Sequence, residues 1–411
     1  MKEANSDRIL FIVFILAVFI DAANGILQKK IGITTPIGVI FRGAVFFYFF
    51  LYLFKNRYRT HFYFLIIFIF MCLLLWSIFY SANLIREFQY LIRYAYFFVV
   101  LNYFSLHRDK YNLAIVYKYI MKYGFIISSI ILICYFTGFG VKSYGEGEYG
   151  WGEKGLFIAT NDIGLTILCT LVCSCIYQHL YCRKKWEITY IIVIALGGIL
   201  VGSRVCFIFI PFTLLLFTLY KAKKTKNKII VILSMSLTMC VVIYIAYQIY
   251  QMLDDYALAK LTQEGFENAR TKLTDEAKRH ISNFDALSVL IGEGVGNLHD
   301  NVGRGLGIDG EKFVEADYYE IVGSFGYLLG GMILFFYLLM AIQSIKYFLK
   351  RRNFESFEIM YMILSFIVIG YFAGHAATNM MATPVLAVSA LVIWNKKRNN
   401  QIFNEKSIYF Q

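Results

Sequence analysis

Charged residues that could carry chemistry stand between Asp254 and Gly331, a hydrophilic stretch that re-enters an apolar segment of this 411-residue chain. Arg270 falls on the apolar stripe of an expected amphipathic helix, where a guanidinium needs an anion, and a diphosphate matches its fork of donors. Glu315 and Asp317 follow at the point where the stretch becomes apolar. A carboxylate at such a boundary has a raised pKa, which suits a general base. These residues predict a site that holds a diphosphate and deprotonates a hydroxyl group.

Each of these residues also has a structural interpretation. Arg270 could pair with a carboxylate of the same stretch, and either acid could cap the helix that begins there, because acids are favoured at helix N-termini. Glu315 and Asp317 lie about 200° apart around that helix, so they do not form a carboxylate pair on one face. Which of them acts as the base stays open.

Polar residues inside the apolar segments are further candidates for contacts with an anionic substrate. Arg204 lies in a Gly-Ser-Arg turn, where an arginine is costly unless it faces a polar cavity or a ligand, or reaches the lipid head groups. The other candidates for substrate binding are Asn161, His375, Asp317 and Arg93. The alternative is that the intramembrane arginines Arg42, Arg86 and Arg93 pair with Asp21 or Glu87.

Two glycine-rich stretches accompany these residues. The turn Gly292–Gly296 has backbone N–H groups that could approach a phosphate, although no strand precedes it as in a phosphate-binding loop. Gly323, Gly326 and Gly330 recur at the spacing of closely packed helices, which indicates a structural role.

The composition places the chain in a membrane. Hydrophobic residues make up 59% and charged residues 16%, whereas soluble domains carry about 25% charged residues. Apolar segments recur that reach the roughly 17–25 residues needed to cross a bilayer as a helix. The net charge of +13 comes largely from Lys and Arg at the ends of these segments, which indicates membrane topology rather than nucleic-acid binding. We therefore expect an all-α polytopic membrane protein with no nucleic-acid partner.

Twelve spans are expected, at residues 9–27, 33–54, 62–80, 84–106, 112–139, 156–181, 186–201, 205–220, 229–252, 318–345, 357–376 and 379–395. Every second junction is rich in Lys and Arg, which places both termini in the cytoplasm. The organisation is then nine spans in residues 1–253, an external loop over 254–317, three spans in 318–395 and a cytoplasmic tail over 396–411. Within the loop, the apolar spacing from Phe266 to Ile291 predicts one amphipathic helix of about 25 residues.

Several motifs between about residues 150 and 385 carry a family resemblance. They are Gly155–Asn161, Val201–Arg204, Arg270, Gly292–Gly296 and Val314–Gly326, with a Gly-His pair at Gly374 and His375. In these motifs the chain resembles the O-antigen polymerase and ligase superfamily, whose members transfer glycans from polyprenyl diphosphate carriers. Ligases of the superfamily carry a His-Asn pair eleven residues before the glycine that Gly326 matches, where this chain has Glu315 and Ala316. The chain is therefore more similar to the polymerase branch.

The resemblance implies a GT-C-like glycosyltransferase of the bacterial inner membrane with a periplasmic active site. Glu315 would deprotonate the acceptor hydroxyl, and Arg204 and Arg270 would bind the donor diphosphate without a metal ion or cofactor. Undecaprenyl-diphosphate-linked oligosaccharides would be donor and acceptor, both held in the lipid bilayer, with a chain-length regulator and a flippase as partner proteins. The alternatives are an O-antigen ligase and a transporter or flippase for lipid-linked oligosaccharides.

Overall fold

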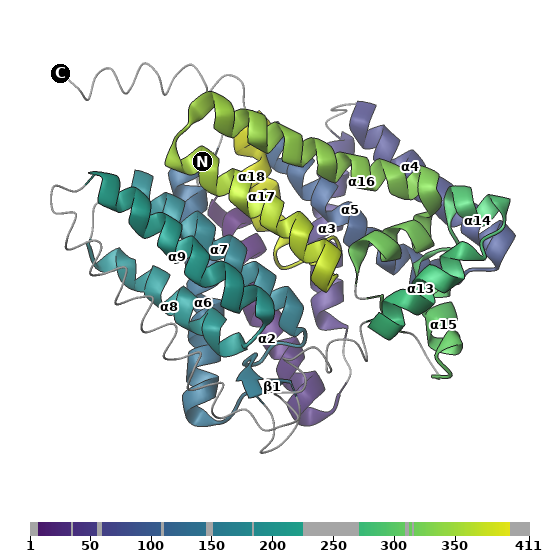
Figure 1. Cartoon of the computed structure of the whole chain (residues 1–411), viewed down its shortest axis with the longest axis horizontal. Coiled ribbons are helices and arrows are strands. Elements are labelled where there is room, and N and C mark those ends of the chain that lie inside the picture. The colour runs from purple at the N-terminus through teal and green to yellow at the C-terminus, as the bar shows by residue number, and fades with distance from the viewer. Residues whose placement is uncertain are drawn as a thin grey trace.

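The computed structural model describes residues 7–33, 36–55, 60–107, 111–144, 151–182, 185–224, 271–308, 312–314 and 316–394. Within these ranges the chain is mostly helical (Figure 1), and seven helices are long and apolar enough to cross a membrane. They are Asp7–Ile31, Ile37–Lys55, Leu113–Thr137, Thr160–Leu180, Arg204–Lys221, Asp317–Arg351 and Phe354–Phe372. The expected class, an all-α polytopic membrane protein, is confirmed.

The helix boundaries follow the expected spans closely. The N-terminal helix comprises the π-helical η1 (Phe11–Leu16), α2 (Ala17–Ile26) and η2 (Leu27–Ile31). The helices that follow are α3 (Ile37–Lys55), α4 (Thr60–Tyr80), α5 (Leu84–Leu106), α6 (Leu113–Thr137), α7 (Thr160–Leu180), α8 (Ile188–Val201), α9 (Arg204–Lys224), α16 (Asp317–Arg351), α17 (Phe354–Ala373) and α18 (Thr383–Trp394). The ninth expected span, 229–252, lies outside the described residues. The total of twelve spans therefore stays a prediction.

Some of the expected spans are short. Within the described residues, the apolar helices α8 and α18 have 14 and 12 residues. With 14 residues, α8 is about 21 Å long, which is less than the roughly 30 Å of a hydrocarbon core. The turn that follows α8 and carries Arg204 therefore lies at or within the membrane boundary if α8 spans.

A β-hairpin in the connection between α6 and α7 was not expected from the sequence. Strand β1 (Lys142–Tyr144) pairs antiparallel with β2 (Trp151–Glu153), in a register that places Lys142 opposite Glu153. Gly152 has φ +69°, and a Cβ there would lie 2.6 Å from the carbonyl oxygen of Val201. The hairpin thus packs directly against the end of α8.

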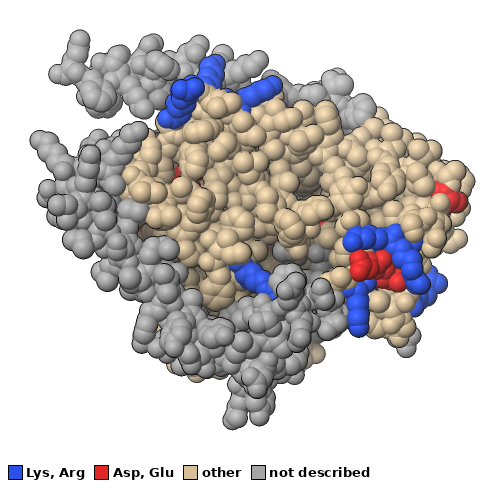
Figure 2. All heavy atoms as spheres, in the orientation of Figure 1, with Lys and Arg blue, Asp and Glu red and all other residues tan. Residues whose placement is uncertain are grey.

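The loop helices form a small unit of their own at one end of the molecule (Figure 1). They are α13 (Lys272–Ser282), α14 (Ala286–Ile291) and α15 (Val295–Gly305). A separate apolar cluster joins Ala277 of α13 to Leu298 and Val302 of α15, and includes Val314. Figure 2 shows charged side chains over this unit and near the C-terminal end of α16, with a broad uncharged surface between them. An uncharged belt of this kind suits contact with lipid.

The expected single amphipathic helix over 266–291 is wrong in its described part, which is two helices. Asn283 ends α13, and Asp285 begins α14 by accepting a hydrogen bond from the Ser288 backbone N–H at 2.7 Å. Hydrogen bonds from the Ser288 side chain and backbone lower the pKa of Asp285. Asn and Asp compete with the helix for backbone partners, so their side chains terminate and restart helices. Arg270 lies outside the described residues.

The expected span over 318–345 lies within the membrane-length helix Asp317–Arg351, but the backbone of this helix breaks at Gly326. There φ is +69° and ψ is −178°, so the segment before Gly326 is a short helix that points in its own direction. The Gly-rich turn fills the break: a Cβ on Gly326 would lie 2.5 Å from the Gly292 backbone nitrogen. The Gly294 N–H also donates to the Ser324 carbonyl oxygen at 3.0 Å. The role of Gly326 is therefore this backbone geometry rather than helix–helix packing alone.

We predict that Gly326→Ala lowers the free energy of unfolding by about 1–3 kcal/mol, because it combines a strained φ with a steric clash. Gly331→Ala on the same helix is the matched control, since a Cβ there meets no atom within 4 Å. Thermal unfolding in detergent, followed by size-exclusion chromatography, measures both. Equal midpoints for the two variants would contradict the tight approach of Gly292 and Gly326.

Candidate functional site

Polar residues from distant parts of the chain meet around the short helix 317–325 at the start of α16. The Asp317 carboxylate is buried and accepts a hydrogen bond from the Ala377 backbone N–H at 2.8 Å, in the connection between α17 and α18. His375 belongs to the same connection, has φ +60°, and interacts electrostatically with Asp317. Asp317 thus anchors the turn that presents His375. Asp317 lies in the first turn of α16, but this hydrogen bond joins it to another segment and does not cap its own helix.

Glu315, the expected base, lies outside the described residues. The residues on either side of it, Val314 and Ala316, are buried. Ala316 directly precedes α16, and its carbonyl oxygen accepts from the Glu320 N–H at 3.0 Å. The two residues next to Glu315 are therefore packed in the interior beneath this site.

Arg93 contributes positive charge from α5. Its guanidinium carbon lies 5.3 Å from the centroid of the Tyr90 ring, a cation–π contact. Among the described residues the half-buried Arg93 has no carboxylate partner in an ion pair. The alternative that the intramembrane arginines pair with acids is confirmed for Arg42, which bonds Asp21, but Arg86 pairs with Asp300 at 2.8 Å instead. Arg93 therefore retains the capacity to bind an anion.

The start of α7 faces the same region. The half-buried Asp162 interacts electrostatically with His375, Arg42 and Arg93, and its carbonyl oxygen accepts from the Asn379 side chain at 3.0 Å. Asn161 is half-buried in the same first turn. Three of the residues expected to bind substrate, Asp317, His375 and Arg93, are thus linked to one another through direct or electrostatic contacts, and Asn161 adjoins them.

Arg204 lies at the start of α9, which packs near the beginning of α7. It is the first residue of α9 and follows Gly202, whose left-handed backbone ends α8. The intervening Ser203 is buried against α7, since a Cβ on Gly164 would lie 2.7 Å from the Ser203 Oγ. The start of α9 therefore packs beside Gly164, which lies three residues after Asn161 on α7.

The Gly292–Gly296 turn does not offer its N–H groups to a phosphate. The backbone nitrogens of Val295 and Gly296 donate to the Glu87 carboxylate at 2.8 and 2.9 Å. Glu87 is fully buried in the first turn of α5, and it places negative charge at the positive end of the α15 dipole. A carboxylate of the protein occupies the place considered for a phosphate, and it couples α5 to the loop helices.

Sequence reasoning missed a buried triad beside the site. The Tyr94 hydroxyl donates to Glu320 Oε1 at 3.1 Å, and His299 Nε2 lies 3.6 Å from the same oxygen. Within the described part of the chain, both ring nitrogens of His299 and Oε2 of Glu320 are buried with no partner at hydrogen-bond distance. Buried polar atoms are nearly always satisfied, so orphaned ones mark a strained or functional position. The only sequence signal was polarity: a histidine in a glycine-rich helix, and an acid three residues after Asp317.

Aromatic rings connect this triad to His375. The Phe313 ring lies 4.5 Å from the His299 ring centroid and 6.0 Å from that of His375, and Tyr90 meets His299 edge-on at 5.3 Å. Phe313 is 40% exposed. It therefore separates the buried His299–Glu320 pair from the surface at the same place where His375 and Tyr90 stand.

An apolar cavity of about 580 Å³ begins at this site. It starts at Asp317 and Tyr318 and runs between α16 and α17 past Leu334, Leu338, Ile367 and Ala341. The rim residues Leu338, Val368 and Tyr371 are about half exposed. The cavity is thus accessible from the lipid-facing side along two membrane-length helices, and one end of it reaches the polar cluster.

No protein-family model matches the chain, and no curated protein sequence matches it. A functional assignment therefore depends on the chemistry of the site.

We predict that Glu87→Gln destabilises the protein by about 1–3 kcal/mol, because an amide NH₂ would face a buried backbone donor. Asp275→Asn is the control, since Asp275 forms an exposed ion pair with Lys278 at 3.0 Å and such pairs contribute about 0–1 kcal/mol. Hydrogen exchange of residues 286–305 measures whether α14 and α15 open more readily. Unchanged exchange in Glu87→Gln would contradict the coupling of α5 to the loop.

Proposed function

We propose that the chain is a surface-polysaccharide polymerase of the bacterial inner membrane. In this reaction it transfers a growing glycan from undecaprenyl diphosphate to a new lipid-linked repeat unit at the periplasmic face. The acceptor hydroxyl oxygen attacks the anomeric carbon, its proton passes to a carboxylate, and the bond from that carbon to the diphosphate breaks. Single displacement of this kind inverts the anomeric configuration.

The observation that carries the proposal is the apolar cavity that runs from Asp317 between α16 and α17. Its volume of about 580 Å³ lies within the roughly 300–1,000 Å³ of ligand pockets. An isoprenoid tail in this cavity brings its diphosphate to the Asp317 end. His375 interacts with Asp317 there, and Asp162 interacts with both His375 and Arg93. A ligand with a long apolar tail and an anionic head fits both the walls and the polar end.

The proposed roles follow from charge and position. Among the described residues Arg93 forms no ion pair, although it contacts Tyr90 and interacts with Asp162. Its guanidinium is proposed to bind the leaving diphosphate and stabilise its growing charge, and Arg204 and Arg270 are proposed to act with it. Glu315 is proposed as the base. Asp317 is a positioning residue, because its carboxylate already accepts from Ala377. No step in this scheme needs a metal ion or a cofactor.

The His299–Glu320 pair favours an acceptor bearing hydroxyl groups. The unpartnered atoms of His299 and Glu320 offer hydrogen-bonding capacity beside the site, and a sugar hydroxyl or a water molecule would satisfy it. A ligase would instead require a histidine at position 315, where this chain has glutamate. The polymerase is therefore preferred over the ligase.

We predict that deletion of the gene in the source strain removes the long-glycan ladder on gels, and that the wild-type chain restores it. Glu315→Gln and Arg93→Gln collapse the ladder to single repeats at equal membrane abundance, because each loses about 2–4 kcal/mol of transition-state stabilisation. Arg279→Gln is the control, since Arg279 is 65% exposed in an ion pair with Glu276. Full ladders from both site variants would sink the proposed site.

Two further measurements separate the proposal from its rivals. Purified protein should polymerise lipid-linked repeats in the presence of EDTA, and loss of turnover there would refute metal independence. Movement of lipid-linked sugar across liposome membranes without polymer formation would support a transporter and contradict the polymerase.

We predict that Leu338→Trp, which places an indole in the α16–α17 cavity, raises KM for full-length polyprenyl donors by about tenfold, since several buried CH₂ groups lose their contacts. Leu328→Trp is the matched control. Both leucines lie on α16 and are 53% and 52% exposed, but the cavity lining includes Leu338 and not Leu328. Donors with short lipid tails should respond less. Equal KM values for the two variants would exclude this cavity as the tail site.

A further inference from the structure

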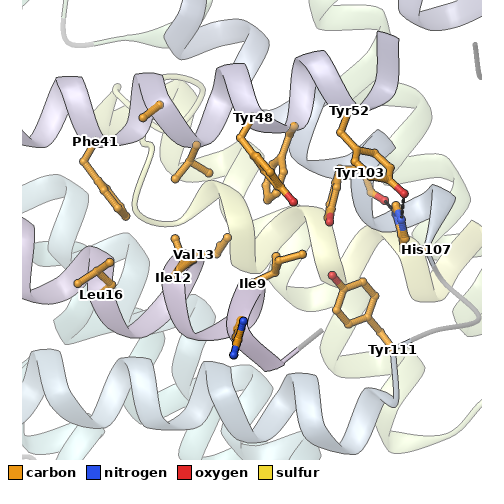
Figure 3. A pocket seen from close by; sticks show the side chains of 14 residues that line it. Ile9, Ile12, Val13, Leu16, Phe41, Tyr48, Tyr52, Tyr103, His107 and Tyr111 are labelled. Atoms are coloured by element: carbon orange, nitrogen blue, oxygen red, sulfur yellow. Dashed lines mark hydrogen bonds between the residues drawn. The ribbon is translucent and has the colours of Figure 1, made fainter. Parts of the chain in front are cut away.

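A second cavity lies among the N-terminal helices, apart from the site described above. It has a volume of about 700 Å³ and is bounded by the N-terminal helix, α3, the end of α5 and the residue that precedes α6 (Figure 3). The N-terminal helix and α3 meet where Asp21 bonds Arg42, and α2 packs against α3 there. Toward the N-terminus, η1 packs against α6 instead. The cavity occupies the space that opens between η1 and α3.

The lining of this cavity changes in character from one end to the other. Figure 3 shows Leu16, Ile12 and Phe41 toward one end, with tyrosines and His107 gathered at the other. The tyrosines are Tyr48, Tyr52, Tyr103 and Tyr111. A tail of hydrocarbon matches the first end, and oxygen acceptors of a head group match the hydroxyl donors of the second.

The polar end is held in place by its own contacts. The His107 Nε2 lies 2.9 Å from the Tyr52 hydroxyl, and its Nδ1 lies 3.1 Å from the Tyr103 carbonyl oxygen. The His107 ring also stacks on Tyr103 with centroids 4.8 Å apart. The hydroxyls of Tyr103 and Tyr111 point into the cavity and toward each other (Figure 3). The polar end of the cavity is therefore a group of hydrogen-bond donors that are held in place by their own contacts.

Charge and access complete the description. Arg8 lines the cavity, and no acidic side chain is among the described residues that do so. The rim residues Ile12 and Tyr48 are 38% and 53% exposed, so the cavity opens along the space between η1 and α3. An opening between two membrane-length helices faces lipid. By the charge of its junctions, this end of the helices is the cytoplasmic one, where anionic lipids attract basic residues.

We infer that this cavity binds one phospholipid with an anionic head group. One acyl chain lies along Leu16, Ile12 and Phe41, and the phosphate lies among Arg8, Tyr48 and Tyr111. The volume falls within the roughly 300–1,000 Å³ of sites that enclose a ligand. Binding here wedges the N-terminal helix and α3 at a fixed separation. The inference does not depend on the proposed polymerase activity.

The test uses phosphatidylglycerol with a photoactivatable group on one acyl chain and the full chain reconstituted in phosphatidylcholine nanodiscs. Labelled peptides should map to residues 8–16, 41–52 and 103–111. Unlabelled phosphatidylglycerol should compete about fivefold better than phosphatidylcholine, the effect of one basic residue at the head-group level. Arg8→Gln should abolish that preference, whereas Lys55→Gln, at the exposed end of α3 and outside the lining, should retain it.

Cavity-filling variants provide the second arm. Val45→Phe should reduce labelling about tenfold, because the added ring occupies the volume of the acyl chain. Val39→Phe is the matched control on α3, since Val39 is 43% exposed and outside the lining. Ile12→Phe, at the rim, replaces Val45→Phe if the latter unfolds. Equal labelling of filled and control variants overturns the inference. So do equal competition by the two phospholipids, labelling elsewhere, or stronger competition by undecaprenyl phosphate than by phosphatidylglycerol.

Discussion

The backbone approach of Gly292 and Gly326 is the constraint on which the candidate site depends. Neither position tolerates a Cβ, so the Gly-rich turn and the break in α16 fit together only as two bare backbones. The break turns residues 317–325 away from the axis of the membrane helix. That direction sets Glu320 against His299 and Tyr94, and it brings Asp317 to the α17–α18 connection. Without the break in α16, Asp317 and Glu320 would lie on the extended helix axis and away from these partners.

Two buried acids of this region, Glu87 and Asp317, accept hydrogen bonds from backbone N–H groups, whereas Glu320 faces Tyr94 and His299. Glu87 accepts from Val295 and Gly296, and Asp317 accepts from Ala377. Hydrogen bonds of this kind stabilise a carboxylate strongly in a low-dielectric setting. Among the described residues Arg93 forms no ion pair with these acids, whereas Arg42 pairs with Asp21. This leaves the positive charge of Arg93 beside Tyr90 and Asp162.

The sequence was informative wherever one element could be recognised from its own residues. The expected span over 84–106 coincides with α5, because an apolar run follows the capping residue Asn83. The break at Gly326 was missed because a glycine in an apolar run does not reveal the sign of its φ. His299 and Glu320 were missed because their proximity comes from that break. Asp317 and His375 were each chosen as candidates, but their meeting at Ala377 depends on how two helices pack, which local patterns do not encode.

Glu87 is synthesised long before the residues that it bonds in the folded protein. Its partners at Val295 and Gly296 lie 208 and 209 residues further along the chain. At a translation rate of about 5–20 residues per second, roughly 10–40 s pass before they leave the ribosome. Throughout that interval α5 lies in or beside the membrane, and the Glu87 carboxyl group lacks the two backbone N–H donors that it bonds in the folded protein. Assembly of this protein therefore depends on its loop, because the hydrogen bonds of Glu87 on α5 form only after α15 has been synthesised.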